Sequence, residues 1–305
     1  MWNYISKIRG SSLGNIFKLK NTNIYNKLMG NLKSSYYKSV KTTYPIESWY
    51  LGFGMLAVSD IKIDLTTIER VKSLKIYYPN EMILYPGKKY PLIVMVNGTG
   101  WVYEKYEATF KHLSSWGFIV VGNDDPSTGL GDSVIKTLNY MLNLNQDSKS
   151  IFYNKIDIER VGLSGHSQGG AGVINAITKF PESSYFKCAY AASAPTKPWT
   201  DTLLGALKYE CSQVKVPTMM TYEQQTPPDD MFYNFNQYDK NLKVIVGIRK
   251  NANHGDMLVA ADSYMTAWFC YILLNDKIAA QAFEGTDAEM PKNELNWNNV
   301  RKQNM

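Results

Sequence analysis

A serine flanked by glycines is the pattern in this sequence best suited to covalent chemistry. It reads Gly165-His166-Ser167-Gln168-Gly169, a match to G-x-S-x-G. This pattern places the serine on a tight turn between a strand and a helix, where its hydroxyl stands clear of the backbone, and the glycines let the chain turn without Cβ clashes. The run before it is typical of a strand and the run after it of a helix. We therefore predict that Ser167 is a nucleophile.

A nucleophilic serine needs a base, and the sequence offers three histidines. His112 precedes the serine, His166 lies beside it on the turn, and His254 follows in a later loop. In enzymes that carry their serine on such a turn, the acid comes after the serine and the histidine comes last. This order selects His254 as the group that takes the serine proton and returns it to the leaving group.

Acyl transfer also needs two N–H donors for the oxyanion of the tetrahedral intermediate. One is expected from the backbone of Gln168, directly after the nucleophile. The second is expected from the loop Asn97-Gly98-Thr99-Gly100-Trp101, which follows an apolar run at 91–96. Thr99 is the predicted donor and Gly100 the alternative, because the glycines allow the backbone to turn its N–H groups toward the site.

Alternating strand and helix patterns must position these residues. Strands are predicted at 71–79, 91–96, 117–123, 158–164, 186–192, 216–222 and 242–248, and helices before residue 116 and at 131–144, 168–179 and 256–274. Such alternation predicts an α/β fold with a mostly parallel central sheet and helices on both faces. We expect a catalytic domain over 47–305, preceded by a basic extension over 1–46.

The charge of the chain is unevenly distributed. The net charge of +6 comes from the extension, which has eight basic and no acidic residues, so the predicted catalytic domain is slightly negative. This argues against nucleic acid as the main substrate. Apolar residues recur at helical spacing in the extension: Tyr25, Leu28, Met29, Leu32 and Tyr36. Three interpretations stay open: a solvated helix or loop that packs loosely on the body, a weak contact with an anionic membrane surface, or a disordered segment.

Cysteine usage and hydropathy give expectations about the compartment. An odd set of three cysteines does not describe a disulfide framework. Cys188 and Cys270 lie in apolar runs typical of a core, whereas Cys211 lies in a polar stretch and is expected to be exposed. The sequence shows neither a clear signal peptide nor an apolar run of about 20 residues. We therefore expect a cytoplasmic protein, and the oligomeric state stays open.

Several segments together resemble a known family. They are "KYPLIVMVNGTG", "HLSSWGFIVVGND", "VGLSGHSQGGAG", "VPTMM", "NHGD" and "TAWFCYILLND", across roughly residues 50–285. This pattern is similar to the dienelactone-hydrolase-like branch of the α/β-hydrolases, and within it to cutinase-type polyester hydrolases and chlorophyllase-like esterases. The resemblance implies the α/β-hydrolase fold and hydrolysis of acyl esters without a metal or an organic cofactor.

Residues beside the predicted donors and nucleophile are candidates for contact with the substrate: Gly98, Gly100, Trp101 and His166. In the family the residue next to the oxyanion donor often packs on the substrate, which here is Trp101. A position in the core, or a surface position without a role, fits Trp101 equally well, as it does Tyr103 and Tyr106.

The chain departs from this family at two positions. Many members carry histidine where Asn97 stands, a change expected to alter the hydrogen bonds of the loop rather than the chemistry. The family also places an aspartate about nine residues after the proline that matches Pro217, which falls near Gln225 or Thr226. Neither side chain is a carboxylate, so the acid must come from elsewhere.

Three carboxylates near that position are candidates for the acid. Glu223 is favoured, because it ends a predicted strand and its longer side chain could reach back toward the base. Asp229 and Asp230 are the alternatives, and they require a loop rerouted by the prolines at 227–228. The leading function is a carboxylic ester hydrolase. A serine peptidase or amidase on the same fold and a catalytically impaired binding protein are the alternatives.

Overall fold

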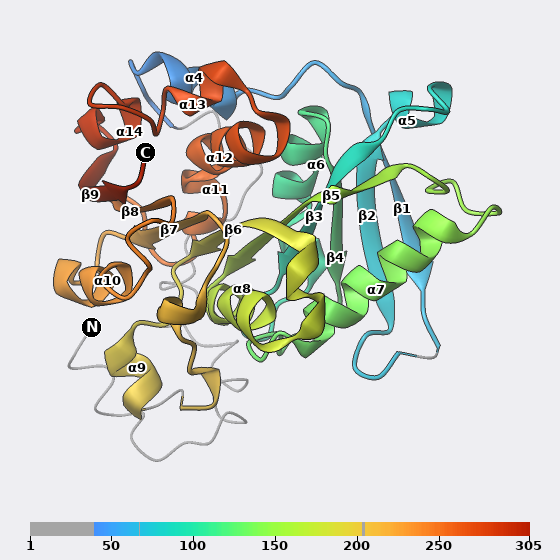
Figure 1. Ribbon diagram of the computed structural model, residues 1–305, viewed down its shortest axis with the longest axis horizontal. Coiled ribbons are helices and arrows are strands. Elements are labelled where there is room, and N and C mark those ends of the chain that lie inside the picture. Colours follow the sequence, from blue (N-terminus) through green and yellow to red (C-terminus); the bar gives the residue numbers. More distant parts are fainter. Residues whose placement is uncertain (1–39, 67, 203–204) are drawn as a thin grey trace.

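A single twisted sheet forms the centre of the computed structural model, which describes residues 40–66, 68–202 and 205–305 (Figure 1). The sheet has nine strands in the order β1-β2-β4-β3-β5-β6-β7-β8-β9. The strands are β1 (Val58–Asp64), β2 (Ser73–Pro79), β3 (Tyr90–Val96), β4 (Ile119–Asn123), β5 (Ile156–His166), β6 (Phe186–Ala192), β7 (Thr218–Glu223), β8 (Val244–Arg249) and β9 (Trp297–Gln303).

Pairing in this sheet is parallel from β4 through β3 and β5 to β8. The β1–β2, β2–β4 and β8–β9 pairs are antiparallel. The mostly parallel sheet predicted from the sequence is therefore confirmed, and each of the seven predicted strands is present. The two edge strands were missed. β1 reads "VSDIKID" and β9 reads "WNNVRKQ", and both are too polar to stand out as strands.

Helices cover both faces of the sheet, as predicted (Figure 1). On one face lie α4 (Pro45–Leu51), α6 (Glu107–Ser115), α11 (Met257–Ala260) and α12 (Asp262–Leu274); on the other lie α7 (Asp132–Gln146), α8 (Gln168–Lys179) and α10 (Pro228–Phe235). Short helices complete the fold: α5 (Glu81–Leu84), α9 (Lys197–Thr202), α13 (Lys277–Ala280) and α14 (Glu289–Lys292). Strand β3 is buried on both sides, because Ile93 belongs to one core and Val94 to the other.

The helix predicted over 256–274 is divided in two. Helix α11 ends at Ala260 and α12 begins at Asp262. The Arg249 side chain donates from Nε to the carbonyl oxygen of Ala260 at 2.9 Å. This carbonyl would otherwise accept a bond from the following turn, so a buried arginine takes the place of one helical hydrogen bond.

The last residues of the predicted extension are hydrogen-bonded to the body. The carbonyl of Lys41 accepts a bond from Asn296 at 2.9 Å, and Tyr44 donates to the carbonyl of Lys292 at 2.7 Å. The N–H of Ile46 donates to Glu289 at 2.8 Å. Residues 41–46 are therefore bound to the body. The helical pattern predicted between residues 25 and 36, and with it the membrane contact, lies outside the described residues.

The cysteines are free and buried, including the one expected at the surface. Cys211 is only 1% exposed, so that expectation was wrong. The polar stretch around it turns the thiol inward, against the core that contains Val214 and Tyr238. Burial raises the pKa of Cys211 to about 12, so it is an unreactive core residue at neutral pH. Across the described ranges, no helix combines the length and the apolar character needed to cross a membrane.

Candidate active site

The turn between β5 and α8 holds Ser167 in a backbone conformation that side chains rarely adopt. Its φ is 60° and its ψ is −126°. Such a conformation costs on the order of 1–3 kcal/mol and persists only where neighbouring contacts impose it. Two hydrogen bonds do so here: the N–H of Ser167 donates to the carbonyl of Ala192 at 2.9 Å, and its carbonyl accepts from Gly170 at 2.8 Å. The side chain remains partly exposed, as a nucleophile requires.

The two glycines of the pattern are required by close backbone contacts. A Cβ added to Gly165 would lie 2.4 Å from the carbonyl oxygen of Gly169. One added to Gly169 would lie 2.1 Å from the carbonyl oxygen of Val96, at the end of β3. Both distances are far below contact distance, so only glycine allows the helix to start this close to the sheet.

The loop after β8 brings His254 to the serine. Its Nε2 lies 2.9 Å from the Oγ of Ser167, although 87 residues separate them in the sequence. The Oδ1 of Asn253 accepts the N–H groups of Gly255 and Asp256, each at 3.1 Å, which shapes the turn that presents the imidazole. About a quarter of the His254 side chain is exposed, so a substrate can reach it.

The last residue of β7 is the carboxylate that lies beside His254. Oε1 of Glu223 lies 3.0 Å from Nδ1 of His254. The next residue binds the two loops together: the N–H of Gln224 donates to the carbonyl of Ala252 at 3.1 Å, and its side-chain oxygen accepts the N–H of Asn251 at 2.6 Å. Sequence reasoning missed Gln224, and a glutamine in a polar loop gives no signal that could have found it.

The other carboxylates considered as acids lie elsewhere. Asp229 and Asp230 occupy the first turn of α10, because that helix begins at Pro228 immediately after the loop. Asp230 accepts a long bond of 3.4 Å from Thr196, and Asp229 is exposed. The structure brings Glu223 to the base and does not bring these two aspartates there.

Electrostatics keep the Glu223–His254 pair in the state that base catalysis needs. Burial raises the pKa of Glu223, but the charge of His254 and the hydrogen bond with His254 outweigh it and lower the pKa to about 2. Burial lowers the pKa of His254, and the Glu223 carboxylate outweighs this and raises it. Glu223 is therefore ionised at neutral pH and holds a proton on Nδ1 of His254, which leaves Nε2 free to accept one.

The second histidine of the turn lies behind the base. His166 is 2% exposed, and its Nε2 lies 2.7 Å from the carbonyl oxygen of His254. Burial, together with the nearby charge of His254, lowers its pKa to about 3, so the ring is neutral and Nε2–H is the donor. The ring also stacks on Trp101, with centroids 5.7 Å apart. The predicted contact of His166 with the substrate is thus replaced by support of the base loop.

The aromatic residues after the oxyanion loop are core residues. Trp101, Tyr103 and Tyr106 are each at most 5% exposed. Trp101 and Tyr106 pack edge to face, with ring centroids 6.1 Å apart. The core interpretation of Trp101 therefore replaces its predicted contact with the substrate. His112 is also fully buried, and its Nε2 lies 2.8 Å from the carbonyl of Gly52, away from the serine.

Hydrogen bonds distinguish among the candidate oxyanion donors. The N–H of Gly100 donates to the carbonyl of Pro126 at 2.8 Å, and the N–H of Gly98 donates to the hydroxyl of Tyr106 at 2.6 Å. Both are therefore occupied, which removes Gly100 as the alternative donor. Within the described part of the chain, the N–H groups of Thr99 and Gln168 have no protein acceptor.

Two side chains fix the loops that carry these donors. Nε2 of Gln168 donates at 2.8 Å to the carbonyl of Pro126, the same oxygen that accepts from Gly100. One carbonyl thus joins the start of α8 to the oxyanion loop. The amide of Asn97 donates at 2.9 Å to the carbonyl of Asp125, which holds the loop after β4 in place. Asn97 therefore ties the loop after β3 to the loop after β4.

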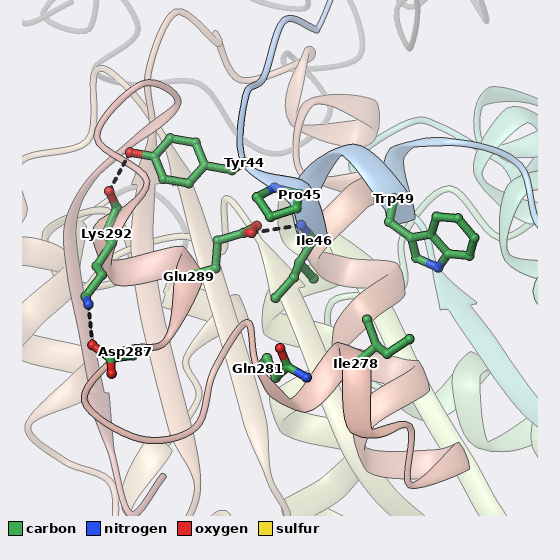
Figure 2. A pocket seen from close by; sticks show the side chains of 9 residues that line it. All are labelled: Tyr44, Pro45, Ile46, Trp49, Ile278, Gln281, Asp287, Glu289 and Lys292. Carbon is green, nitrogen blue, oxygen red and sulfur yellow. Dashed lines mark hydrogen bonds and ion pairs between the residues drawn. The ribbon is translucent and has the colours of Figure 1, made fainter.

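A groove of about 600 Å³ lies away from these residues, between α4, α13 and α14 (Figure 2). Its polar side chains already have partners, since Lys292 pairs with Asp287 at 2.5 Å and Glu289 accepts the N–H of Ile46. None of the predicted site residues lines it. Among the described residues, no cluster of three or more His, Cys, Asp or Glu is arranged to hold a metal ion.

Known proteins with similar sequences are hydrolases. The family model described as PET hydrolase-like (PETase) matches residues 55–283. "Cutinase 2" of Thermobifida cellulosilytica is 28% identical over 150 residues, which are 48% of this chain and 49% of that protein. "Cutinase cut1" of Thermobifida fusca is also 28% identical over 150 residues, which are 48% of this chain and 40% of that protein. The chain spans about half the length of the curated relatives it matches.

The family match covers more than half of the chain and includes the serine turn, the acid strand and the base loop. The sheet order and the helices on both faces are those of an α/β-hydrolase. The resemblance to cutinase-type polyester hydrolases is thereby confirmed. This chain belongs to the PET hydrolase-like family of α/β-hydrolases.

Proposed function

We propose that this protein is a serine hydrolase that cleaves carboxylic esters through an acyl-enzyme intermediate. Ser167 is the nucleophile, His254 the general base and Glu223 the acid. The backbone N–H groups of Gln168 and Thr99 form the oxyanion hole. No metal or organic cofactor takes part in this chemistry, which is an acid–base and nucleophilic reaction throughout.

One observation carries the proposal: a continuous hydrogen-bonded path joins three side chains from three separate loops. It runs from Ser167 Oγ to His254 Nε2 at 2.9 Å, and from Nδ1 to Glu223 Oε1 at 3.0 Å. Both lengths are within the range expected for a base that must receive the proton of its nucleophile. The strained φ of Ser167 and the family of the chain support the same proposal.

Acylation follows from these contacts. As the Oγ of Ser167 attacks the ester carbon, its proton passes to Nε2 of His254, and the carbonyl oxygen becomes an oxyanion held by the two free N–H groups. Glu223 stabilises the imidazolium that forms. His254 then gives the proton to the alkoxide leaving group, and the carbon–oxygen bond to the alcohol breaks. The acyl group stays on the serine.

Deacylation repeats these steps with water as the nucleophile. His254 takes a proton from water, the hydroxide oxygen attacks the acyl carbon, and the bond to Ser167 breaks as its oxygen recovers the proton. The products are an alcohol and a carboxylic acid. The cutinase names of the relatives and the PET hydrolase-like family favour polyester chains as the first substrates to test beside small esters.

The direct test is covalent labelling with a fluorophosphonate, which reacts only with an activated serine. We expect one phosphonyl group per chain, located on Ser167 by peptide mass mapping. Ser167→Ala should abolish labelling and lower ester turnover on the order of 10⁴–10⁶-fold while the fold is retained. A label on another serine, or no label on the folded protein, contradicts the proposal, and the latter result favours a binding protein.

A second measurement separates the ester hydrolase from a peptidase or amidase. Hydrolysis is compared for p-nitrophenyl esters of rising chain length, the matching p-nitroanilides and a polyester film. We expect turnover of the esters to exceed that of the anilides by several orders of magnitude, because an amine is the poorer leaving group and needs stronger proton donation. Comparable rates for esters and anilides would favour the amidase alternative.

A further inference from the structure

One oxygen of the acid lacks the partner that a buried carboxylate needs. Oε1 of Glu223 faces His254, while Oε2 is buried and has no hydrogen-bond partner among the described residues. A carboxylate oxygen without a donor in a buried site costs on the order of 1–3 kcal/mol, more for a charged group. The sequence position of the acid is also unusual for the family. These two facts raise the question of what holds Glu223 in place.

A serine beside the end of β7 has the matching property. Ser193 directly follows β6, and its N–H donates to the carbonyl of Thr221 in β7 at 2.7 Å, two residues before Glu223. Its side chain is 4% exposed, and its Oγ is likewise buried without a partner in the described part of the chain. A buried donor and a buried acceptor, both unpaired, therefore lie at neighbouring strand ends.

The backbone of Ser193 is strained in a way that suits this role. Its φ is 50°, in the left-handed region that favours glycine or asparagine. A serine there persists only where surrounding contacts impose the conformation. The electrostatics agree with the geometry, because the neighbouring Ser193 side chain is among the groups that lower the pKa of Glu223.

We propose that Ser193 is a positioning residue for the acid: its hydroxyl donates to Oε2 of Glu223 and fixes the carboxylate against His254. This inference rests on the proposed function, because it assigns Ser193 a role only through the acid of the triad. A glutamate at a strand end has one more rotatable bond than an aspartate. Fixing its second oxygen compensates for the added freedom, and the Oε1 contact to His254 keeps its geometry.

The test compares Ser193→Ala, Ser193→Gly and Glu223→Gln, with the double variant Ser193→Ala/Glu223→Gln. The rate of phosphonylation by a fluorophosphonate is measured for all four variants and for the unmodified protein. This rate can be measured even when the serine reacts slowly. Both Ser193 variants should react roughly tenfold more slowly, the loss typical of one hydrogen bond to a charged group. Ser193→Gly controls for the backbone, because glycine accepts the left-handed conformation without strain.

Two readouts separate positioning from a general structural role. In the Glu223→Gln background, Ser193→Ala should change the rate less than about twofold, because the carboxylate that Ser193 is proposed to position is already gone. The acidic limb of kcat/KM against pH, measured on a p-nitrophenyl ester, should also move to higher pH in Ser193→Ala. The reason is that a carboxylate with one donor fewer favours the imidazolium beside it more strongly.

Other results overturn the inference in distinct ways. Ser193→Ala could slow phosphonylation by the same factor with and without Glu223→Gln, or Ser193→Gly could react at the full rate. Either result means that the hydroxyl does not act through the acid. If Glu223→Gln is slow and Ser193→Ala is normal, this inference alone fails. If Glu223→Gln labels at the full rate, the acid of the proposed function is wrong and the role of Ser193 falls with it.

Discussion

The ends of β5 and β7 both carry side chains of the proposed site, and they are constrained in different ways. At the end of β5, backbone atoms approach so closely that Gly165 and Gly169 leave no room for a Cβ. At the end of β7, Glu223 reaches the base with a long side chain, and its position differs from that expected for the family. Backbone contacts restrict which residue type can stand at each position of the serine turn. The acid needs only a carboxylate within reach of His254.

This difference explains why one half of the site follows a motif and the other half does not. A turn with φ of 60° admits few sequences, so the serine turn is recognisable. A carboxylate can reach Nδ1 of His254 from several backbone positions, provided that neighbouring residues hold its loop in place. Here Gln224 joins the acid loop to the base loop by two hydrogen bonds. Substitutions at the two strand ends should therefore have different consequences.

The largest expected loss of activity is for replacement of the proposed base, His254. His254→Ala should lower ester turnover by roughly 10⁴–10⁶-fold, and combining it with Ser167→Ala should add little, because the two residues act as a unit. Turnover of a p-nitrophenyl ester in the single and double variants measures this. His112→Ala is a poor control because that ring is fully buried. If the loss of turnover in the double variant equals the product of the two single losses, the two side chains act independently.

The serine turn should not tolerate even a methyl group in place of a glycine hydrogen. Gly169→Ala places a Cβ 2.1 Å from the carbonyl of Val96, so we expect a loss of about 3 kcal/mol or more in the free energy of unfolding, or no folded protein. Gly87→Ala is the matched control, because a Cβ there meets nothing within 4 Å. It should change stability by less than about 0.5 kcal/mol in urea denaturation. Equal stability of the two variants would remove the steric explanation.

Much of this molecule could be predicted from its sequence, and the exceptions have physical causes. Strand β3 is apolar throughout and β6 nearly so, which made both recognisable, whereas the polar edge strand β9 was not. Local sterics made Ser167 predictable, and chain order made His254 the choice among three histidines. The orientation of Trp101 depends on tertiary packing against His166, which no local pattern records.

Contacts between loops that are distant in the chain could also not be predicted from the sequence. The carbonyl of Pro126 accepts from Gln168, 42 residues later in the chain, and Ser193 lies 30 residues before Glu223, the carboxylate that it is proposed to position. Their residue types are ordinary for loops, so only the fold brings these residues together. The same holds for the break between α11 and α12, which is explained by an arginine from β8.

The smallest expected effect is a pH dependence of stability that originates at the end of β7. The pKa of Glu223 is lowered to about 2 in the folded protein, below its value of about 4.3 in an unfolded chain. Its contribution to stability is therefore complete above the unfolded pKa and is lost as the pH falls toward 2. The stability difference between the unmodified protein and Glu223→Gln, from urea denaturation, should shrink between pH 5 and pH 2. A constant difference would mean that the carboxylate is not stabilised in the fold.

The central claim is that the acid of the triad stands at the end of β7, and one comparison of turnover tests it most directly. The rate on a p-nitrophenyl ester is measured for Glu223→Gln, Asp229→Asn and Asp230→Asn. An amide cannot steady the imidazolium and favours the wrong tautomer, so Glu223→Gln should lose about 10⁴-fold. The two α10 variants, whose carboxylates do not contact His254, should stay within about twofold. A large loss in Asp229→Asn or Asp230→Asn with a normal rate in Glu223→Gln would contradict the claim.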